Sequence, residues 1–87
     1  MYRVLISRKV ERSINKLRLN EKKKMVRLLD DLRETGPVQP GWKNFSKIGE
    51  NIYHCHLSYK WVICWKVSED NSTLEVFYAG SRENAPY

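Results

Sequence analysis

The stretch "NIYHCHLSYKWVICWKV", residues 51–67, decides the fold because it holds two β-branched and aromatic runs joined by a polar turn near Ser58. Such runs are typical of half-buried strands, and residues two apart on a strand point to the same side of a sheet. The pattern therefore predicts a β-hairpin with two different faces. The apolar face takes Tyr53, Cys55 and Leu57. The opposite face, called here the histidine face, takes His54 and His56.

A third strand is predicted from "LEVFYAG", residues 74–80, after the polar turn "SEDNST". The three strands then form an antiparallel meander, and alternation extends both faces. The apolar face gains Trp61, Ile63, Trp65, Val67, Leu74, Val76 and Tyr78. The histidine face gains Lys60, Val62, Cys64, Lys66, Glu75, Phe77 and Ala79.

Upstream of the hairpin, "YRVLIS" alternates as a short strand, and two stretches of helical periodicity follow it. The first helix is predicted to begin at the N-cap Ser7, with the apolar stripe Val10, Ile14 and Leu17. The second is predicted to begin at the N-cap Asn20 and to end at Gly36 and Pro37. Its stripe is Met25, Leu28, Leu29 and Leu32. The segment "GPVQPGWKN" then predicts a crossing loop.

These elements predict one α+β domain over residues 1–87, in the order strand, helix, helix, strand, strand, strand. A chain of this length has room for one small core. The short connection between the helices predicts an antiparallel helical hairpin, whose apolar seam must be covered by the sheet. We therefore expect both helices on one face of a small twisted antiparallel sheet, with the histidine face left partly bare.

The charge balance favours a polyanionic partner. The chain has 16 Lys and Arg residues against 10 Asp and Glu, giving a net charge of +6 and a pI near 9.5. The basic residues of the two helices are a candidate surface for ribosomal RNA, and the alternative is the solvated face of an amphipathic pair. No signal peptide and no apolar run long enough for a membrane span are found, which predicts a cytoplasmic protein. Cys55 and Cys64 are expected to be reduced, buried thiols.

Two motifs resemble the RelE/ParE superfamily of bacterial toxin–antitoxin toxins. The segment "KIGENIY", residues 47–53, resembles that family's "K-L-x-G-x-L-Y", and "GSR", residues 80–82, is followed by an aromatic residue as in the family. The resemblance extends over essentially the whole chain. It implies a RelE-like fold and a ribosome-dependent endoribonuclease that cuts messenger RNA during translation. It also implies a small acidic antitoxin as partner.

The resemblance implies site residues position by position. His54 and His56 occupy the strand where related toxins place basic or acid–base residues. Arg82 matches the basic residue after the last strand's glycine, and Tyr87 matches the terminal aromatic. Lys47 matches a lysine just before the histidine strand. The sequence departs from the family at Trp61, where many relatives carry an arginine that contacts the scissile phosphate.

The chemistry of RNA cleavage by a 2′-hydroxyl sets what the site must contain. It requires a base for the hydroxyl, positive charge for the transition state and an acid for the leaving 5′-oxygen. A histidine titrates near neutrality and can serve as base or acid. We therefore expect His54, His56, Arg82 and Tyr87 to be catalytic. RNA or phosphate binding is expected of Lys47, Lys60, Lys66 and Phe77, without a metal or cofactor.

Other functions remain open, both from the residues and within the family that the sequence resembles. A histidine pair on a strand face often consists of solvent-exposed residues with no functional role. A ParE-like toxin would use the same fold to poison DNA gyrase, although its relatives generally lack a histidine-rich face. A third hypothesis is a toxin-derived protein that has lost its activity and is retained as an antitoxin-binding module. Trp61 supports it, because many relatives carry an arginine at that position.

Overall fold

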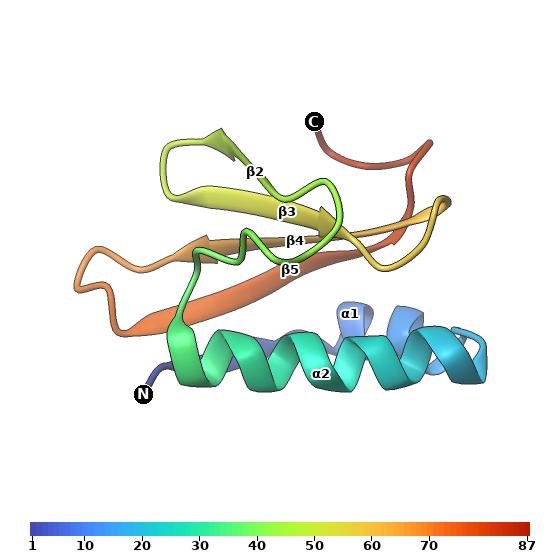
Figure 1. Cartoon of the computed structure of the whole chain (residues 1–87), viewed down its shortest axis with the longest axis horizontal. Helices are drawn as coiled ribbons and strands as arrows, with labels where there is room; N and C mark the ends of the chain where they lie inside the picture. The colour runs from blue at the N-terminus through green and yellow to red at the C-terminus, as the bar shows by residue number, and fades with distance from the viewer.

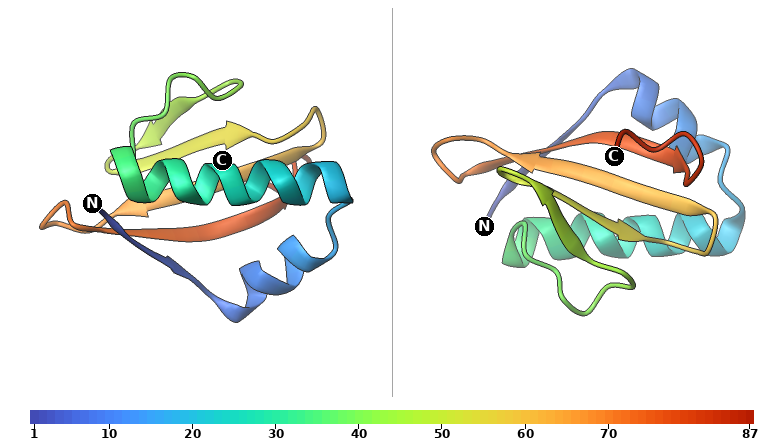
Figure 2. Two further views of the ribbon diagram at one scale, coloured as in Figure 1. Left: turned by 60° about the horizontal axis from the view of Figure 1, so that its bottom comes forward. Right: turned by 90° about the horizontal axis from the view of Figure 1, so that it is seen from above.

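A five-stranded mixed sheet, covered by helices on one face, forms the architecture of the computed structural model, which describes residues 1–87. The elements in chain order are β1 (Arg3–Ile6), α1 (Arg8–Asn15), α2 (Leu19–Thr35), β2 (Ser46–Gly49), β3 (Ile52–His56), β4 (Trp61–Val67) and β5 (Thr73–Ser81). Both helices lie below the sheet in Figure 1, and the two further views agree (Figure 2). The predicted α+β class and the single helix-covered face are confirmed. No helix is both long and apolar enough to cross a membrane.

The strand order is β1-β5-β4-β3-β2, which corrects the predicted sheet in two respects. The sheet is mixed, because β1 pairs with β5 in parallel while the other neighbours are antiparallel. It also contains an additional strand, β2, which pairs with β3. β2 was not predicted from the sequence, because the strand has only four residues and two of them are poor strand formers. Its pairing also contains a register shift between Lys47 and Gly49.

The first helix begins as predicted, and the second begins earlier than predicted. The Ser7 hydroxyl accepts a hydrogen bond from the Val10 N–H at 3.2 Å, which caps α1. The N-cap of α2 is Arg18, without a side-chain cap, and Asn20 lies inside the first turn. Leu17 is buried just before this cap, so its burial sets where the chain turns into α2. Tertiary packing here overrides the capping preference of Asn20.

The core lies between the helices and the sheet. It consists of Val10, Leu17, Met25, Leu28, Leu32, Cys55, Leu57, Ile63, Trp65, Val67, Leu74, Val76 and Ala79. The predicted stripes of both helices and the predicted apolar faces of β3 and β4 all contribute to it. Burying these apolar side chains is the main favourable term for folding.

A β-bulge reverses the predicted faces in the second half of β5. The register shifts between Cys64 and Trp65, so that Trp65 pairs with Val76 but Cys64 pairs with Tyr78. Directly paired residues project to the same side of a sheet. Tyr78 therefore joins the histidine face and Ala79 joins the core, the reverse of the prediction. An extra residue in one strand cannot be detected from alternation alone.

The crossing loop at residues 36–45 is held against the C-terminal half of α2. The Gln39 side-chain amide donates to the Asp31 and Gly36 carbonyls at 3.1 and 2.8 Å. The Trp42 indole N–H donates to an Asp31 carboxylate oxygen at 2.9 Å. Gly36 has a φ of +88°, and a Cβ there would lie 2.6 Å from the Tyr2 ring. The loop is therefore a fixed wall beside the end of β3.

Candidate active site

The two histidines lie side by side on β3, on the sheet face turned away from the helices. Their ring centroids are 5.5 Å apart in an edge-on arrangement. His54 pairs with Cys64 and His56 pairs with Val62, which places both on the predicted face. The histidine face was expected to be partly bare. At the two histidines it is not, because each is only 7% exposed. The segment after β5 runs on the side of the sheet that faces away from the helices (Figure 1).

His56 is held in its neutral form by its surroundings. Burial is the main cause that lowers its pKa, and the positive charges of His54, Arg82 and Lys43 lower it further. Its backbone N–H donates to the Lys43 carbonyl at 2.8 Å, which fixes the end of β3 against the crossing loop. At neutral pH the His56 ring is therefore an uncharged base close to positive charge.

His54 is oriented by β2. The Ser46 hydroxyl lies 3.0 Å from His54 Nδ1, and the Ser46 carbonyl oxygen lies 3.5 Å from the same nitrogen. These contacts follow from the direct pairing of the two residues across β2 and β3. A partner on one ring nitrogen fixes the plane of the ring and leaves Nε2 for other contacts.

Tyr87 folds back onto this pair. Its ring centroid lies 4.5 Å from that of His54, with the planes at 61°. Burial raises the pKa of the Tyr87 phenol, the nearby Cys64 adds to the rise, and Arg82 opposes it. The phenol therefore keeps its proton at neutral pH and is available as a donor.

Arg82 reaches the same end of the sheet from the last strand. Its N–H donates to the Lys60 carbonyl at 2.7 Å, and its guanidinium lies 5.4 Å from the centroid of the Tyr59 ring. Arg82 and Lys60 line a cavity of about 560 Å³ together with Tyr59, Ser81 and Glu83. The structure thus brings Lys60 next to Arg82, and Arg82 close enough to His56 to influence its titration.

Three of the residues predicted to bind phosphate lie away from this cluster. Lys47 pairs with Tyr53 and therefore belongs to the helix side of the sheet. Lys66 is on the histidine face but lies toward its far end, where its ammonium is 3.5 Å from the Glu75 carboxylate. Phe77 is the extra residue of the β5 bulge. Trp61, at the position of the family's arginine, packs against the core.

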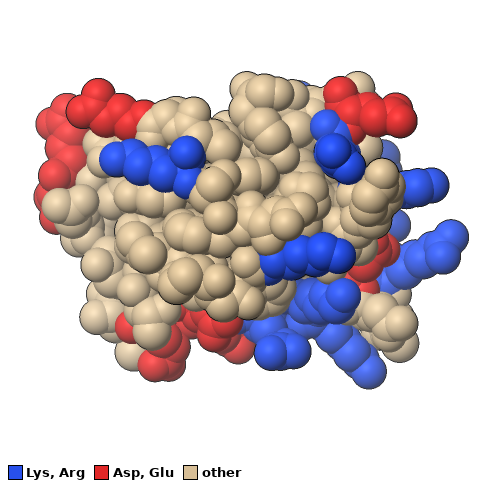
Figure 3. Space-filling model, turned by 45° about the horizontal axis from the view of Figure 1, so that its top comes forward, with Lys and Arg blue, Asp and Glu red and all other residues tan.

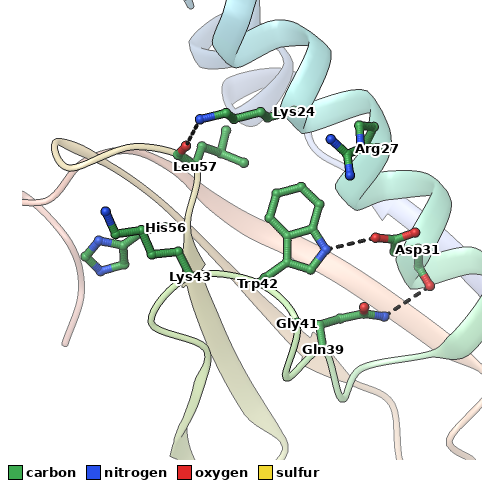
Figure 4. A pocket seen from close by; sticks show the side chains of 9 residues that line it. All are labelled: Lys24, Arg27, Asp31, Gln39, Gly41, Trp42, Lys43, His56 and Leu57. Carbon is green, nitrogen blue, oxygen red and sulfur yellow. Dashed lines mark hydrogen bonds between the residues drawn. The ribbon is translucent and has the colours of Figure 1, made fainter.

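A second cavity lies on the other side of His56 and was not found from the sequence. It has a volume of about 350 Å³ and is called here the α2 cleft. Figure 4 shows Lys24 and Arg27 reaching toward it from α2, with Lys43 and His56 opposite them. Trp42 and Asp31 form its inner wall. No periodicity marks Lys43, because it lies in an irregular loop.

No group of three or more His, Cys, Asp or Glu residues is placed to hold a metal ion. Cys64 lies on the histidine face and Cys55 in the core, so the two thiols lie on opposite sides of the sheet. Burial raises the pKa of each thiol to about 12, which leaves both protonated.

Basic side chains gather at one end of the molecule. Figure 3 shows them toward the right, where Figure 1 places the α1–α2 connection and the β3–β4 turn. Acidic side chains lie mainly toward the left and the lower edge of the same view. On the face shown, Lys and Arg side chains are therefore most frequent toward the end of the sheet where β3 finishes and the segment after β5 begins.

Solved structures share this fold, although no protein-family profile and no curated protein matches the sequence. The RelE–RelB complex from Pyrococcus horikoshii OT3 gives a TM-score of 0.76 at 15% identity, over 97% of this chain and 98% of that chain. The YoeB–YefM complex from Staphylococcus aureus gives 0.72 at 11% identity, over 94% and 98%. The isolated RelE toxin from E. coli gives 0.73 at 16%, over 99% and 89%. The RelE-like fold that the sequence resemblance implied is confirmed.

Proposed function

We propose that this protein is the toxin of a type II toxin–antitoxin system and cleaves messenger RNA during translation. One observation carries the proposal: His54, His56 and Tyr87 lie together on one sheet face of a RelE-like fold, and the positive charge of Arg82 is near enough to lower the pKa of His56. These residues come from the middle of the sheet and from the segment after β5, and they supply the functions that 2′-hydroxyl attack requires.

His56 is the general base in this proposal. Its lowered pKa keeps the ring neutral, so it can take the proton of the attacking 2′-hydroxyl. The oxygen then attacks the adjacent phosphorus, and the P–O5′ bond breaks. The products are a 2′,3′-cyclic phosphate and a 5′-hydroxyl.

The leaving 5′-oxygen receives its proton from the other side of the cluster. Tyr87 has a raised pKa and keeps its proton, and its ring lies 4.5 Å from that of His54. Tyr87 is the donor to the leaving oxygen in this scheme, and the ring of His54 positions it. At neutral pH the His56 ring is neutral and the Tyr87 phenol is protonated, which are the states that a base and an acid must start from.

Positive charge around the phosphate comes from Arg82 and Lys43. Both side chains act electrostatically on His56, so a phosphate at His56 lies within reach of their field. Such charge stabilises the extra negative charge that develops on the phosphoryl oxygens. Lys60, beside Arg82, adds to the field at the same end.

An acidic antitoxin and the translating ribosome are the partners of this toxin in the cytoplasm. The solved RelE–RelB and YoeB–YefM complexes, which share the fold, support the antitoxin. The net charge of +6 suits both an acidic protein and RNA. Ribosomal RNA is expected to contact the basic end of the molecule, which includes the start of α2.

A reconstituted translation system tests the proposal against its alternatives. We expect the purified protein to cut a translated message and to leave the same message intact without ribosomes. DNA gyrase poisoning, with no RNA cleavage, would point to the ParE-like function instead. Antitoxin binding with neither activity would point to an inactive relative.

A further inference from the structure

The α2 cleft has a charge pattern that its own fold does not require. Lys24, Arg27 and Lys43 line it against a single carboxylate, Asp31. The two ion pairs of the molecule are Arg33–Asp30 and Lys66–Glu75, so none of these cations has a carboxylate partner. The Asp31 carboxylate is itself occupied by the Trp42 indole N–H at 2.9 Å. The cleft therefore presents uncompensated positive charge.

The walls of the cleft are fixed before any ligand binds. Asp31 and Gln39 tie the crossing loop to α2, and Lys24 Nζ donates to the Leu57 carbonyl at 3.1 Å. Lys24 has three ammonium hydrogens, so this bond leaves donors free. The volume of about 350 Å³ lies at the small end of the range for ligand sites, which suits one nucleotide.

His56 connects the cleft to the cluster where cleavage is proposed. It lines the cleft with Lys43, and it also lies 5.5 Å from His54 on the other side. An RNA strand whose phosphate sits at His56 must continue in some direction. The cleft offers a positively charged path directly beside that phosphate.

We infer that the α2 cleft binds the nucleotide next to the scissile phosphate, with Lys24 and Arg27 contacting its phosphate. The inference rests on the proposed function, because the position of His56 is what joins the cleft to RNA. The ligand class is a single nucleotide unit of single-stranded RNA. Lys and Arg are suited to phosphate, and their contacts add affinity without selecting a base.

An NMR titration locates the nucleotide directly. The probe is a trinucleotide with 2′-O-methyl groups on every ribose, which blocks the attacking hydroxyl, added to the ¹⁵N-labelled full chain. We expect backbone shifts at Lys24, Arg27, Gly41 and Lys43 together with shifts at His54 and His56. Shifts confined to the histidine face would overturn the inference, and so would the absence of any shift.

Gly41 offers a variant that changes the cleft while sparing its cations. A Cβ at Gly41 meets nothing within 4 Å, so a side chain there projects into open space. Gly41 lines the cleft, so Gly41→Glu places a carboxylate and extra bulk beside it, and we expect trinucleotide affinity to fall about tenfold. Gly41→Gln adds a side chain of nearly the same size without the charge, so it should lose less trinucleotide affinity. Unchanged affinity in Gly41→Glu would contradict the inference.

A matched pair of arginines on α2 gives the second comparison. Arg27 lines the cleft, whereas Arg33 is paired with Asp30 on the surface at 3.0 Å. We expect Arg27→Ala to weaken trinucleotide binding about tenfold and Arg33→Ala to leave it unchanged. Equal losses from both would show that the effect is only general positive charge, which would overturn the inference.

The outcomes separate this inference from the proposed function. Suppose that the parent cuts messages on ribosomes and that Gly41→Glu binds the trinucleotide as tightly as the parent does. Nucleotide binding in the α2 cleft would then be refuted, while the proposed ribonuclease activity would be supported. Suppose instead that the parent does not cleave RNA, yet the NMR signals of the cleft residues still shift when the trinucleotide is added. The proposed ribonuclease activity would then be refuted, and the cleft would remain an RNA-binding site. A cleft that responds only to an acidic antitoxin peptide would overturn the RNA assignment.

Discussion

The ring of Tyr87 lies edge-on to the ring of His54, with centroids 4.5 Å apart. This contact joins the last residue of the described chain to the middle of the sheet, and it covers part of the histidine pair. Tyr87 itself remains partly open to solvent, since the residue is 53% exposed. A partly exposed phenol above two covered imidazoles is well placed to meet an RNA phosphate arriving from solvent.

Removing only the Tyr87 hydroxyl tests its role as a proton donor. In Tyr87→Phe the ring still packs on His54, so the fold should not change. We expect the cleavage rate on ribosomes to fall on the order of 10²-fold, the usual scale for a general acid. Single-turnover rates measure this loss, and thermal unfolding provides the control. A rate equal to that of the parent would remove the Tyr87 hydroxyl from the mechanism.

The lowered pKa of His56 predicts how the stability of the fold depends on pH. Burial is the main cause of the shift, so the folded state takes up a proton at His56 less readily than the unfolded state, whose pKa is near 6.5. The free energy of unfolding should therefore hold steady above about pH 6.5 and decline as the pH falls below it. Urea unfolding at several pH values measures this, and His56→Asn should flatten the decline. An equally steep decline in the variant would assign it to other groups.

Arg82 is expected to act on the transition state rather than on the fold. It is exposed, and its backbone N–H, not its side chain, makes the contact with Lys60. We expect Arg82→Ala to cost about 2–4 kcal/mol of transition-state stabilisation, as for other groups that stabilise developing charge. Cleavage kinetics on ribosomes measure the loss, and Arg82→Lys should recover part of it. Full activity in Arg82→Ala would leave Lys43 and Lys60 to supply the charge.

Two glycines near the crossing loop should respond very differently to alanine. Gly36 has a φ of +88° and a Cβ would meet the Tyr2 ring at 2.6 Å, so Gly36→Ala should destabilise the fold by about 1–3 kcal/mol or more. Gly41 has open space around its Cα, so Gly41→Ala should change stability by less than about 0.5 kcal/mol. Urea unfolding of both variants checks the contrast. Equal stabilities would mean that Gly36 does not hold the end of α2 as described.

The sequence predicted those parts of the fold that follow from simple periodicity. Period-two alternation placed Cys55 and Ile63 in the core and His54 on the opposite face, because β3 and the paired part of β4 are regular. It failed at Tyr78 and Ala79, since a bulge adds one residue and reverses the faces beyond it. β2 was missed because four residues carry too little pattern.

The candidate site was predicted less completely, for a different reason. His54, His56, Arg82 and Tyr87 were selected by family resemblance, and alternation supported only the two histidines. Nothing in local pattern says that Tyr87 folds back or that an irregular loop brings Lys43 to His56. These are contacts between distant parts of the chain. Lys47 was chosen by family resemblance and Lys66 by its charge and by alternation. The pleat places Lys47 on the helix side of the sheet, and Lys66 lies on the histidine face but at its far end, beside Glu75.

Cleavage of a message on translating ribosomes, with chemical identification of the new ends, tests the central claim most directly. We predict that the parent produces a 2′,3′-cyclic phosphate and a 5′-hydroxyl, that His56→Ala loses most of this activity, and that His54→Ala also slows it while both variants stay folded. Intact messages with the parent protein, or undiminished cleavage in both histidine variants, would contradict the account.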